Sequence, residues 1–567
     1  MPDISQRNLP FYWAFQCLER FYEAGVRHII ISPGSRSTPL TLAAAIHKGF
    51  KKHVILDERS AAFFALGIGK STGMPALLIC TSGTAVANYY PAIIEAKKSS
   101  VPLIALTADR PPRLQGSGAN QTINQQRIFG DYPLVFKDVG LPSEEESKLH
   151  ELQQLIDNSL KITLDKKGPI HLNFPFDKPL EPEQDFVTKI KAKETNSELE
   201  KGEQEYHSDS YGEVPPSIAN KINEAKKPLV VIGQLPAGVA VDSCIELAQK
   251  INAPVLSEVS QYSSEFCVQQ FDGFLRNRDL LDKLKPDLVL RFGLQPASKG
   301  LLQALKYWKP IPHVYFSIAD MWSDVASSVT CRAKWNDSMF NLNPIQTKKK
   351  DWLHDWKKEE ATFSARANTL IKSKSTLTDG HVYHILSAKI PSDCFLFFSN
   401  SFSARDRSLF GQWDSQQVFT NRGASGIDGI TSTAMGTTIG TNKPGILFTG
   451  DLAFLHDTNA LLNHNKLTQP LVIVVLNNSG GSIFRMLPIT EHKEYFNTYF
   501  ETPQQAKISK LCESYNIDYT HVESIDELHK LDLKGIIRKA NPKLHVVECV
   551  TDPDQSMELR NNLWGKS

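Results

Sequence analysis

Asp451 and Asn478 have the residue types and the spacing of a metal site. Each follows an apolar run, 445–448 and 471–476, that predicts a buried strand. They lie 27 positions apart, which leaves room for one helix between two parallel strands. Carboxylate and amide oxygens suit Mg²⁺, which adds phosphate oxygens and water to one or two protein ligands. The pair therefore predicts a metal that anchors a diphosphate, although either segment alone could be a simple turn.

Glu58 is a second candidate for chemistry. It lies in Asp57-Glu58, at the start of the apolar segment Arg59 to Gly67, which predicts a strand-to-helix junction. Acids in this position commonly complement the helix dipole. The alternative is a carboxyl that points into an apolar interface and hydrogen-bonds a cofactor nitrogen. The residues leave both interpretations open.

Short apolar runs alternate with helical stretches along the chain, and this predicts parallel α/β sheets. We expect buried strands at 26–31, 76–80, 103–107, 170–174, 229–232, 288–292, 314–316, 394–398, 445–448, 471–476 and 544–550. Two polar stretches look like connections between domains. They are Glu181 to Gly212 and Asn341 to Glu360, and the second, with its basic run 348–350, could include a surface helix. These two connections divide the chain into three α/β blocks, at 1–185, 213–340 and 375–567.

Composition excludes several classes of protein. The net charge is +1, so no general basic field points to nucleic acid or to an anionic membrane. The eight cysteines form no CxxC pair, which predicts buried free thiols and neither a zinc site nor a disulfide framework. The apolar runs are far shorter than the roughly 20 residues that cross a bilayer. The first residues, MPDISQRNLPFYW, carry no signal-peptide pattern, so we expect a cytoplasmic protein.

Asp451, Asn478 and Glu58 together resemble the motifs of the thiamine-diphosphate enzyme superfamily. In that superfamily a Gly-Asp-x … Asn-Asn pattern binds metal and diphosphate. A glutamate of another domain, usually from a partner subunit, contacts the aminopyrimidine. The resemblance implies these roles for the three residues here, with Glu58 as the catalytic acid and the backbone carbonyl of Gly480 as a third metal ligand. Leu452 stands where the superfamily usually has glycine, and this departure points to a subfamily.

The superfamily resemblance also implies the fold. We expect three doubly wound parallel-sheet α/β domains: a pyrimidine-binding domain at 1–185, a central domain at 213–340, and a diphosphate- and metal-binding domain at 375–567.

Several further segments are similar to one family, the 2-succinyl-5-enolpyruvyl-6-hydroxy-3-cyclohexene-1-carboxylate synthases of menaquinone biosynthesis. They are SPGSRSTPL at 32–40, TSGTAVAN at 81–88, LTADRPP at 106–112, GANQTIN at 118–124, NRGASGIDG at 421–429 and GSIF at 481–484. The resemblance covers nearly the whole chain and is thinnest in the middle block. It implies that 2-oxoglutarate is decarboxylated on thiamine diphosphate with Mg²⁺ or Mn²⁺. The succinyl carbanion equivalent then adds to isochorismate, in a homodimer or a homotetramer.

The family resemblance assigns further site residues. For the cofactor it implies Asn120, Gln121, Ser425, Ile427 and Ile483, with Ile427 as the bulky residue that bends the cofactor. For the substrates it implies Ser35, Arg36, Arg110, Gln121, Lys299, Ser401, Arg405, Arg422, Phe484 and Leu487. Gly300 stands where some relatives have arginine, so the middle domain's share in substrate binding is left open.

The arginines fit this chemistry independently of any family. Both substrates are dianions, and Arg36, Arg110, Arg405 and Arg422 all lie in loops after predicted strands, where α/β sheets place ligands. The planar guanidinium suits bidentate binding of a carboxylate. Two alternatives stay open: another thiamine-diphosphate 2-oxoacid decarboxylase or acetolactate-type synthase, and a silent paralogue that retains the fold. His456 is interpreted as a structural helix histidine.

Overall fold

The computed structural model describes residues 4–196, 215–237, 239, 241–258, 265–317, 322–335, 351–539 and 543–565. Its packing divides the chain into two compact units. The first comprises residues 1–208 with the short pieces 236–238 and 435–441, and the second comprises the remainder.

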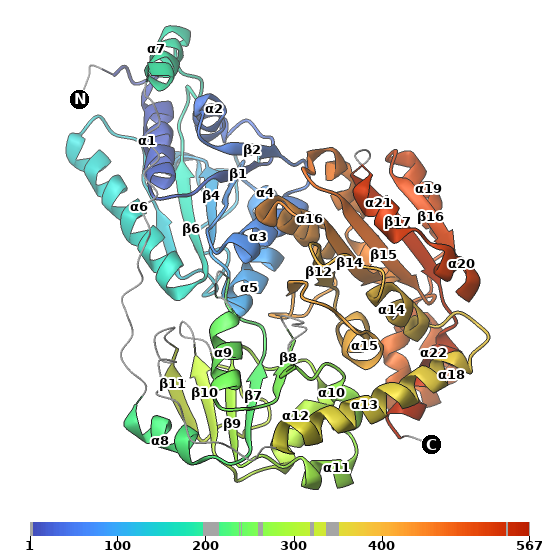
Figure 1. Cartoon of the computed structure of the whole chain (residues 1–567). Helices are drawn as coiled ribbons and strands as arrows, with labels where there is room; N and C mark the ends of the chain where they lie inside the picture. The colour runs from blue at the N-terminus through green and yellow to red at the C-terminus, as the bar shows by residue number, and fades with distance from the viewer. Residues whose placement is uncertain are drawn as a thin grey trace. The chain divides into compact units, whose positions relative to one another are not determined.

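A six-stranded parallel sheet forms the centre of the first unit (Figure 1). Its order is β2-β1-β3-β4-β6-β5, from β1 (His28–Ile31), β2 (Lys51–Val54), β3 (Leu77–Cys80), β4 (Leu103–Asp109), β5 (Val135–Asp138) and β6 (Pro169–Pro175). Helices α1 (Leu9–Glu23), α2 (Thr38–Ile46) and α6 (Glu146–Lys166) share one apolar core with the sheet. Helices α3 (Glu58–Thr72) and α5 (Tyr90–Ser99) pack on each other and on strands of the sheet, and the short α4 (Thr84–Ala87) follows β3.

The second unit contains two parallel sheets (Figure 1). The five-stranded sheet has the order β11-β10-β9-β7-β8, from β7 (Pro228–Ile232), β8 (Val255–Ser257), β9 (Leu288–Phe292), β10 (His313–Ser317) and β11 (Cys331–Lys334). The six-stranded sheet has the order β13-β12-β14-β15-β17-β16, from β12 (Phe395–Phe398), β13 (Val418–Thr420), β14 (Gly445–Gly450), β15 (Leu471–Asn477), β16 (Asp518–Val522) and β17 (Leu544–Val550).

The helices of this part of the chain alternate with these strands. Around the five-stranded sheet lie α8 (Pro216–Glu224), α9 (Asp242–Lys250), α10 (Phe271–Phe274), α11 (Arg278–Lys283) and α12 (Lys299–Tyr307). Before, between and after the strands of the six-stranded sheet come α14 (Asp379–Ser387), α15 (Ser403–Phe410), α16 (Ile430–Thr441), α17 (Asp451–His456), α18 (Lys493–Phe496), α19 (Ile508–Ser514), α20 (Ile525–Lys530), α21 (Leu533–Arg538) and α22 (Pro553–Leu563). One apolar core contains residues of both sheets, so the two are packed as one body.

All eleven strands expected from apolar runs are present, with ends shifted by at most a few residues. The sequence prediction missed β2, β5, β8, β11, β13 and β16, and these are the two edge strands of each sheet. An edge strand is covered less completely than a central one, so it needs no continuous apolar run. Accordingly β2 buries one residue of four, and β8 and β13 have only three residues each. The α/β fold class with parallel sheets is confirmed.

The two expected connections contain helices. The first includes α7 (Gln184–Asn196), while 197–212 lies outside the described residues. In the second, the basic run 348–350 also lies outside them, and α13 (Asp351–Lys372) begins directly afterwards. The surface helix that the sequence allowed there is present: of the 22 residues of α13 only five are buried, and among them Trp352 and Trp356 pack in the core of the second unit. The two indoles supply enough apolar area to anchor the helix.

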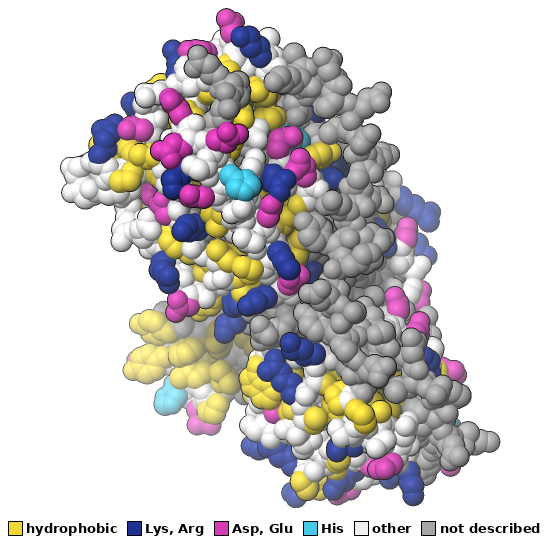
Figure 2. Space-filling model, turned by 90° about the vertical axis from the view of Figure 1, so that its left-hand side faces the viewer, with side chains coloured by type: hydrophobic (Ala, Val, Ile, Leu, Met, Phe, Trp, Pro, Cys, Tyr) yellow, Lys and Arg dark blue, Asp and Glu magenta, His cyan; other side chains and the backbone are white. Residues whose placement is uncertain are grey.

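Other expectations from composition agree with the structure. All eight cysteines are free thiols, and all but Cys331 are buried. Among the described helices, none has the length and apolar character needed to span a bilayer. Figure 2 shows Lys and Arg side chains interspersed with Asp and Glu side chains over the visible face, in line with the net charge of +1.

Candidate active site

The carboxyl ends of four neighbouring strands carry the candidate residues of the second unit. In sheet order, Arg422 follows β13, Ser401 follows β12, Asp451 follows β14 and Asn478 follows β15. A cavity of about 180 Å³ opens at this edge. Its lining includes seven residues chosen from sequence: Ser401, Ile427, Asp451, Asn478, Gly480, Ile483 and Phe484. Ligands of open α/β sheets bind at this edge, because the loops after parallel strands meet there.

Asp451 is a buried carboxylate at the first position of α17, with 5% of its surface exposed. Burial raises its pKa to about 6, while the backbone N–H groups of Leu452 and Gly480 act in the opposite direction. Leu452 N donates to its Oδ1 at 2.9 Å. Asp451 takes part in none of the ion pairs found among the described residues. A buried carboxylate in this state is stabilised by a cation, so Asp451 fits a metal ligand.

Asn478 lines the same cavity, and a hydrogen bond to Asp379 holds its side-chain amide. Its Nδ2 donates to Asp379 Oδ2 at 3.2 Å, and its backbone carbonyl accepts from Ser482 Oγ at 3.3 Å. With the nitrogen engaged, Oδ1 is the end of the amide that is left to ligate a metal. The donor set of one carboxylate, one amide oxygen and one backbone carbonyl is the hard-oxygen chemistry that Mg²⁺ and Mn²⁺ prefer.

Gly480 allows a close backbone approach that a residue with a side chain would prevent. Its φ is +123°, and a Cβ at this position would collide with the carbonyl oxygen of Glu501. That same carbonyl accepts from Gly481 N at 2.6 Å. Glu501, at the end of the π-helical turn Asn497–Glu501, therefore lies directly against Gly480 and Gly481. This close packing keeps the Gly480 backbone at the cavity wall.

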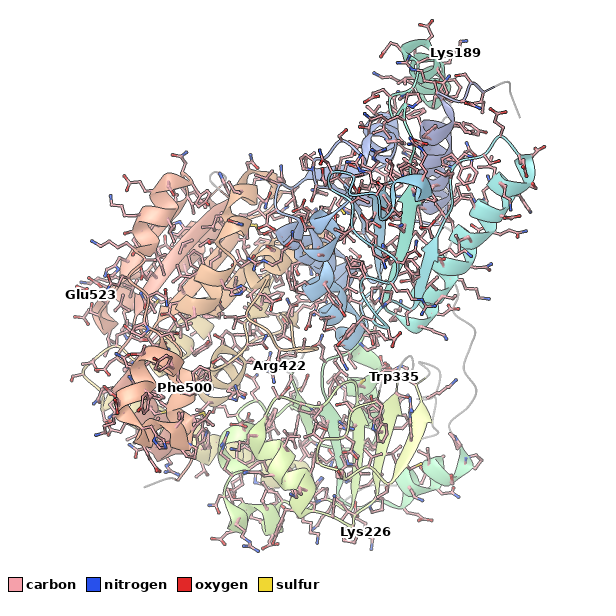
Figure 3. All side chains as sticks on the ribbon, turned by 180° about the vertical axis from the view of Figure 1, so that it is seen from behind. Lys189, Lys226, Trp335, Arg422, Phe500 and Glu523 are labelled. Atoms are coloured by element: carbon pink, nitrogen blue, oxygen red, sulfur yellow. The ribbon has the colours of Figure 1, made fainter. Side chains whose placement is uncertain are left out.

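Apolar side chains form one side of the cavity. Ile483 and Phe484 come from a 3-10 turn at Ser482–Met486, and the rings of Phe484 and Phe500 lie 6.0 Å apart in an edge-on contact (Figure 3 labels Phe500). Ile427 lines the cavity although 39% of its surface is exposed. Leu487, in contrast, is not part of the lining, and 49% of it is exposed.

A cluster of arginines lies beside this cavity. Arg405 Nη1 donates to Ser401 O at 2.6 Å, and Arg422 Nη1 donates to Asn400 Oδ1 at 3.2 Å. Burial and the nearby charge of Arg422 lower the pKa of Arg405. Arg407, which no sequence motif marks, belongs to the same cluster, and burial lowers its pKa to about 10. Like charges held close together in a low-dielectric site attract anions, so the cluster fits a dianionic substrate.

Arg422 and Arg407 also line a small space between the two sheets of the second unit, where Figure 3 labels Arg422. Glu258 and Gln295 of the five-stranded-sheet region share this lining. Ser425, which was expected to bind cofactor, does not line the larger cavity; its hydroxyl donates to Arg422 O at 3.4 Å. The arginine cluster therefore lies where residues of both sheets meet.

Lys299 is exposed at the first turn of α12, and two acids hold the backbone around it. Glu258 accepts from Ala297 N at 2.6 Å and from Ser298 N at 2.8 Å, and Asp272 accepts from Gly300 N at 3.0 Å. A Cβ on Gly300 would collide with the carbonyl oxygen of Asp272. This contact explains why glycine stands at position 300.

The candidate residues of the first unit gather at the corresponding edge of its own sheet. Ser35 and Arg36 follow β1, and Arg36 N donates to Thr81 Oγ1 of the β3 loop at 3.3 Å. After β4, Arg110 Nη2 donates to Asn120 O at 2.9 Å. Gln121 Nε2 donates to Ser82 O at 3.1 Å.

Glu58 opens α3, after Asp57, which caps the helix by accepting from Arg59 N at 2.8 Å. Asp57 therefore fills the capping role, and Glu58 lies in the first turn of the helix, where both interpretations of its carboxyl stay open. Among the described residues, no group of three His, Cys, Asp or Glu side chains forms a metal cluster, and the cavity offers mixed oxygen ligands instead.

Several residues at the cavity carry no motif by which the sequence could mark them. Asp379, Tyr383, Phe402 and Ser403 all line it. Asp379 has the sequence signature of an ordinary helix start, Thr378-Asp379, and its contact with Asn478 spans 99 positions. No local pattern could have revealed that contact.

Comparisons with known proteins show which class of protein this chain belongs to. The family model described as "Thiamine pyrophosphate enzyme, N-terminal TPP binding domain" matches residues 14–128, and its C-terminal counterpart matches residues 408–549. Fold and site thus define a thiamine-diphosphate enzyme.

Curated relatives called 2-succinyl-5-enolpyruvyl-6-hydroxy-3-cyclohexene-1-carboxylate synthase narrow the assignment. One from Listeria innocua is 35% identical, covering 97% of this chain and 96% of the relative. One from Bacillus pumilus is 34% identical, with coverage of 94% and 93%. One from Gloeothece citriformis is 35% identical, with coverage of 93% and 94%. The chain belongs to the family of these synthases.

Proposed function

We propose that this chain catalyses the synthase reaction of its family in menaquinone biosynthesis. In this reaction 2-oxoglutarate loses CO₂, and the remaining succinyl-semialdehyde unit adds to isochorismate to give 2-succinyl-5-enolpyruvyl-6-hydroxy-3-cyclohexene-1-carboxylate. The proposal is supported by two observations together. The chain matches cofactor-binding domains and full-length relatives, and it places an arginine cluster beside a cavity lined by oxygen ligands.

The residues of the second unit fit the metal and the diphosphate. Asp451 Oδ, Asn478 Oδ1 and the Gly480 carbonyl would hold Mg²⁺ or Mn²⁺, and the buried carboxylate without an ion-pair partner among the described residues supports this set. When bound, thiamine diphosphate supplies a thiazolium that accepts the electron pair released by decarboxylation. Ile427, Ile483 and Phe484 would keep water away from the reacting carbon, which favours loss of a charged carboxylate.

Arg405 and Arg422 would bind substrate carboxylates, and Lys299 would add a third cation from the five-stranded-sheet region. Leu487 would contact substrate and Ser425 would contact cofactor, although neither lines the cavity. We assign Ser35, Arg36, Arg110, Asn120 and Gln121 of the first unit to substrate and cofactor contacts at their sheet edge. Glu58 would exchange a proton with the aminopyrimidine nitrogen of the cofactor.

We further propose three domains near 1–185, 213–340 and 375–567, a homodimer as the smallest active unit, and a cytoplasmic location. The dimer follows from the family pattern, in which the glutamate and the metal site of one active centre come from different chains.

The test is an assay with purified protein, thiamine diphosphate and Mg²⁺. We expect 2-oxoglutarate to be consumed rapidly only when isochorismate is present, with one CO₂ released per product formed, as measured by mass spectrometry. Pyruvate in place of 2-oxoglutarate should give little turnover, because it lacks the second carboxylate. Efficient pyruvate use with no requirement for isochorismate would instead identify an acetolactate-type synthase or a decarboxylase.

A further inference from the structure

Asp379 is a buried acid behind the metal-ligand candidate Asn478, and its side chain accepts three hydrogen bonds. Asn478 Nδ2 donates to Oδ2 at 3.2 Å, and Arg560 Nη2 donates to the same oxygen at 2.5 Å. Thr551 Oγ1 donates to Oδ1 at 2.6 Å. Only 1% of Asp379 is exposed, so these protein groups stand in for water.

A carboxylate acceptor selects one of the two orientations of the Asn478 amide. An ionised carboxylate accepts hydrogen bonds and cannot donate one. The amide must therefore turn its NH₂ toward Asp379, and Oδ1 then becomes the exposed end. Only the oxygen can bind a hard cation such as Mg²⁺. If Asn478 flipped, it would present NH₂ to the metal position and oppose a carboxylate with its own oxygen.

Arg560 supplies the positive charge that stabilises the Asp379 carboxylate at this depth. Its guanidinium also forks onto Asp406, with Nε donating to Oδ1 at 3.0 Å and Nη2 to Oδ2. It lies 3.6 Å from the centroid of the Phe402 ring, which lines the cavity. Burial opposes the charge on Arg560, but the carboxylates of Asp406 and Asp379 together raise its pKa above the ordinary value.

The last helix of the chain supplies this support. Arg560 lies on α22, and Ser556 of the same helix accepts from Asp379 N at 3.0 Å. Asp552, which caps α22, donates its backbone N–H to Leu377 O at 2.9 Å. The chain around Asp379 is thus fixed to α22 at three points.

We propose that Asp379, held by Arg560 of the C-terminal helix, is a positioning residue that sets the amide orientation of Asn478 and so makes it a metal ligand. The inference rests on the proposed function, since it assumes the metal site. Asp379 touches neither metal nor substrate in this account; it acts through Asn478.

The test compares Asp379→Ala with Asp379→Asn by calorimetry of Mg²⁺ binding in the presence of thiamine diphosphate, and by the Mn²⁺ electron paramagnetic resonance signal. The Ala variant leaves the amide free to flip, and supporting groups of this kind typically contribute about 10–100-fold in metal affinity. We expect a loss of that size, with kcat largely recovered at saturating Mg²⁺. The Asn variant should retain most of the affinity, because its oxygen can take the place of Oδ2 while the Thr551 hydroxyl turns to accept from its NH₂.

Asp406→Ala is the matched control, because it removes the other carboxylate from the same guanidinium without touching Asn478. It should lower the thermal unfolding midpoint yet leave the Mg²⁺ affinity close to the wild-type value. If the Ala variant at 379 does not fold, Asp379→Ser replaces it: a hydroxyl both donates and accepts, so it selects no amide orientation, and the same loss is expected.

Two results would overturn the inference. Equal Mg²⁺ affinity in wild type and in the Ala or Ser variant would show that Asn478 needs no positioning. Equal losses in the Ala and Asn variants would show that the charge of Asp379 acts on the metal through space. A wild-type protein that binds Mg²⁺ and cofactor but forms no product would overturn the proposed function alone.

Discussion

At the scale of single residues, three buried carboxylates differ in whether an arginine balances their charge. Asp451 is buried without an ion-pair partner among the described residues, whereas Asp379 and Asp406, which are also buried, share Arg560. Burial penalises each carboxylate, and a cation offsets the penalty. Arg560 thus supplies the counter-charge of Asp379 and Asp406, whereas Asp451, which has none among the described residues, is the residue that we propose as a metal ligand.

Replacement of Asp451 by alanine should sharply weaken retention of the cofactor. The variant loses the anionic group that we propose as a metal ligand, so both Mg²⁺ and thiamine diphosphate should bind weakly in calorimetry. Glu494→Ala, which removes an exposed acid of the same unit, is the control and should bind both normally. Wild-type affinity in Asp451→Ala would exclude this residue from the metal site.

Arg405 and Arg422 should each contribute to binding of the dianionic substrates. Alanine at either position should reduce kcat/KM for 2-oxoglutarate or isochorismate by a factor that corresponds to roughly 1.5–3 kcal/mol, typical of a charged hydrogen bond. Lysine should restore activity only partly, since a point charge lacks the planar fork. Steady-state kinetics with Arg538→Ala, an exposed arginine, as control decides the matter. Unchanged kcat/KM for both substrates in both alanine variants would remove these arginines from the site.

At the scale of elements, strand ends and helix starts place Glu58, Lys299 and Asp451. Hydrogen bonds fix the backbone at the start of α12, where Glu258 and Asp272 accept from three N–H groups around Lys299. The edge strands are the opposite case: all are short, and β2 and β5 are also partly exposed, so they carry little sequence signal and the prediction missed them.

Gly300→Ala should disturb the α12 start and lower stability. The added Cβ meets the backbone carbonyl of Asp272, which cannot move as a side chain could, and overpacking of this kind typically costs about 1–3 kcal/mol. Thermal unfolding should show the loss, and KM for substrate should rise if Lys299 takes part in binding. Gln303→Ala, on the exposed face of the same helix, should be neutral or slightly stabilising. An unchanged unfolding midpoint in Gly300→Ala would mean that the helix start relaxes freely.

At the scale of the whole molecule, Glu58 belongs to the first unit and Asp451 to the second. We propose that these two roles meet across a subunit interface. Glu58→Gln and Asp451→Ala should each be inactive, the first while still binding cofactor. Mixed after verified subunit exchange, they should regain activity, because a hybrid dimer contains one site with neither defect. Exchange without recovery would mean that Glu58 acts within its own chain or not at all.

The amino-acid sequence by itself determined the central strands, the order of α/β units and the residues at strand ends, because continuous apolar runs and motif spacing are local properties. Asp451, Asn478, Gly480, Ile427, Ile483 and Phe484 can therefore be chosen from the sequence alone, and one cavity contains them all. Only the tertiary structure decided what supports them. Arg560 meets Asp379 across 181 positions, and Glu258 meets Ala297 across 39. Contacts of this kind depend on how distant elements pack, and no pattern within a segment encodes which buried acid will meet an arginine and which will not.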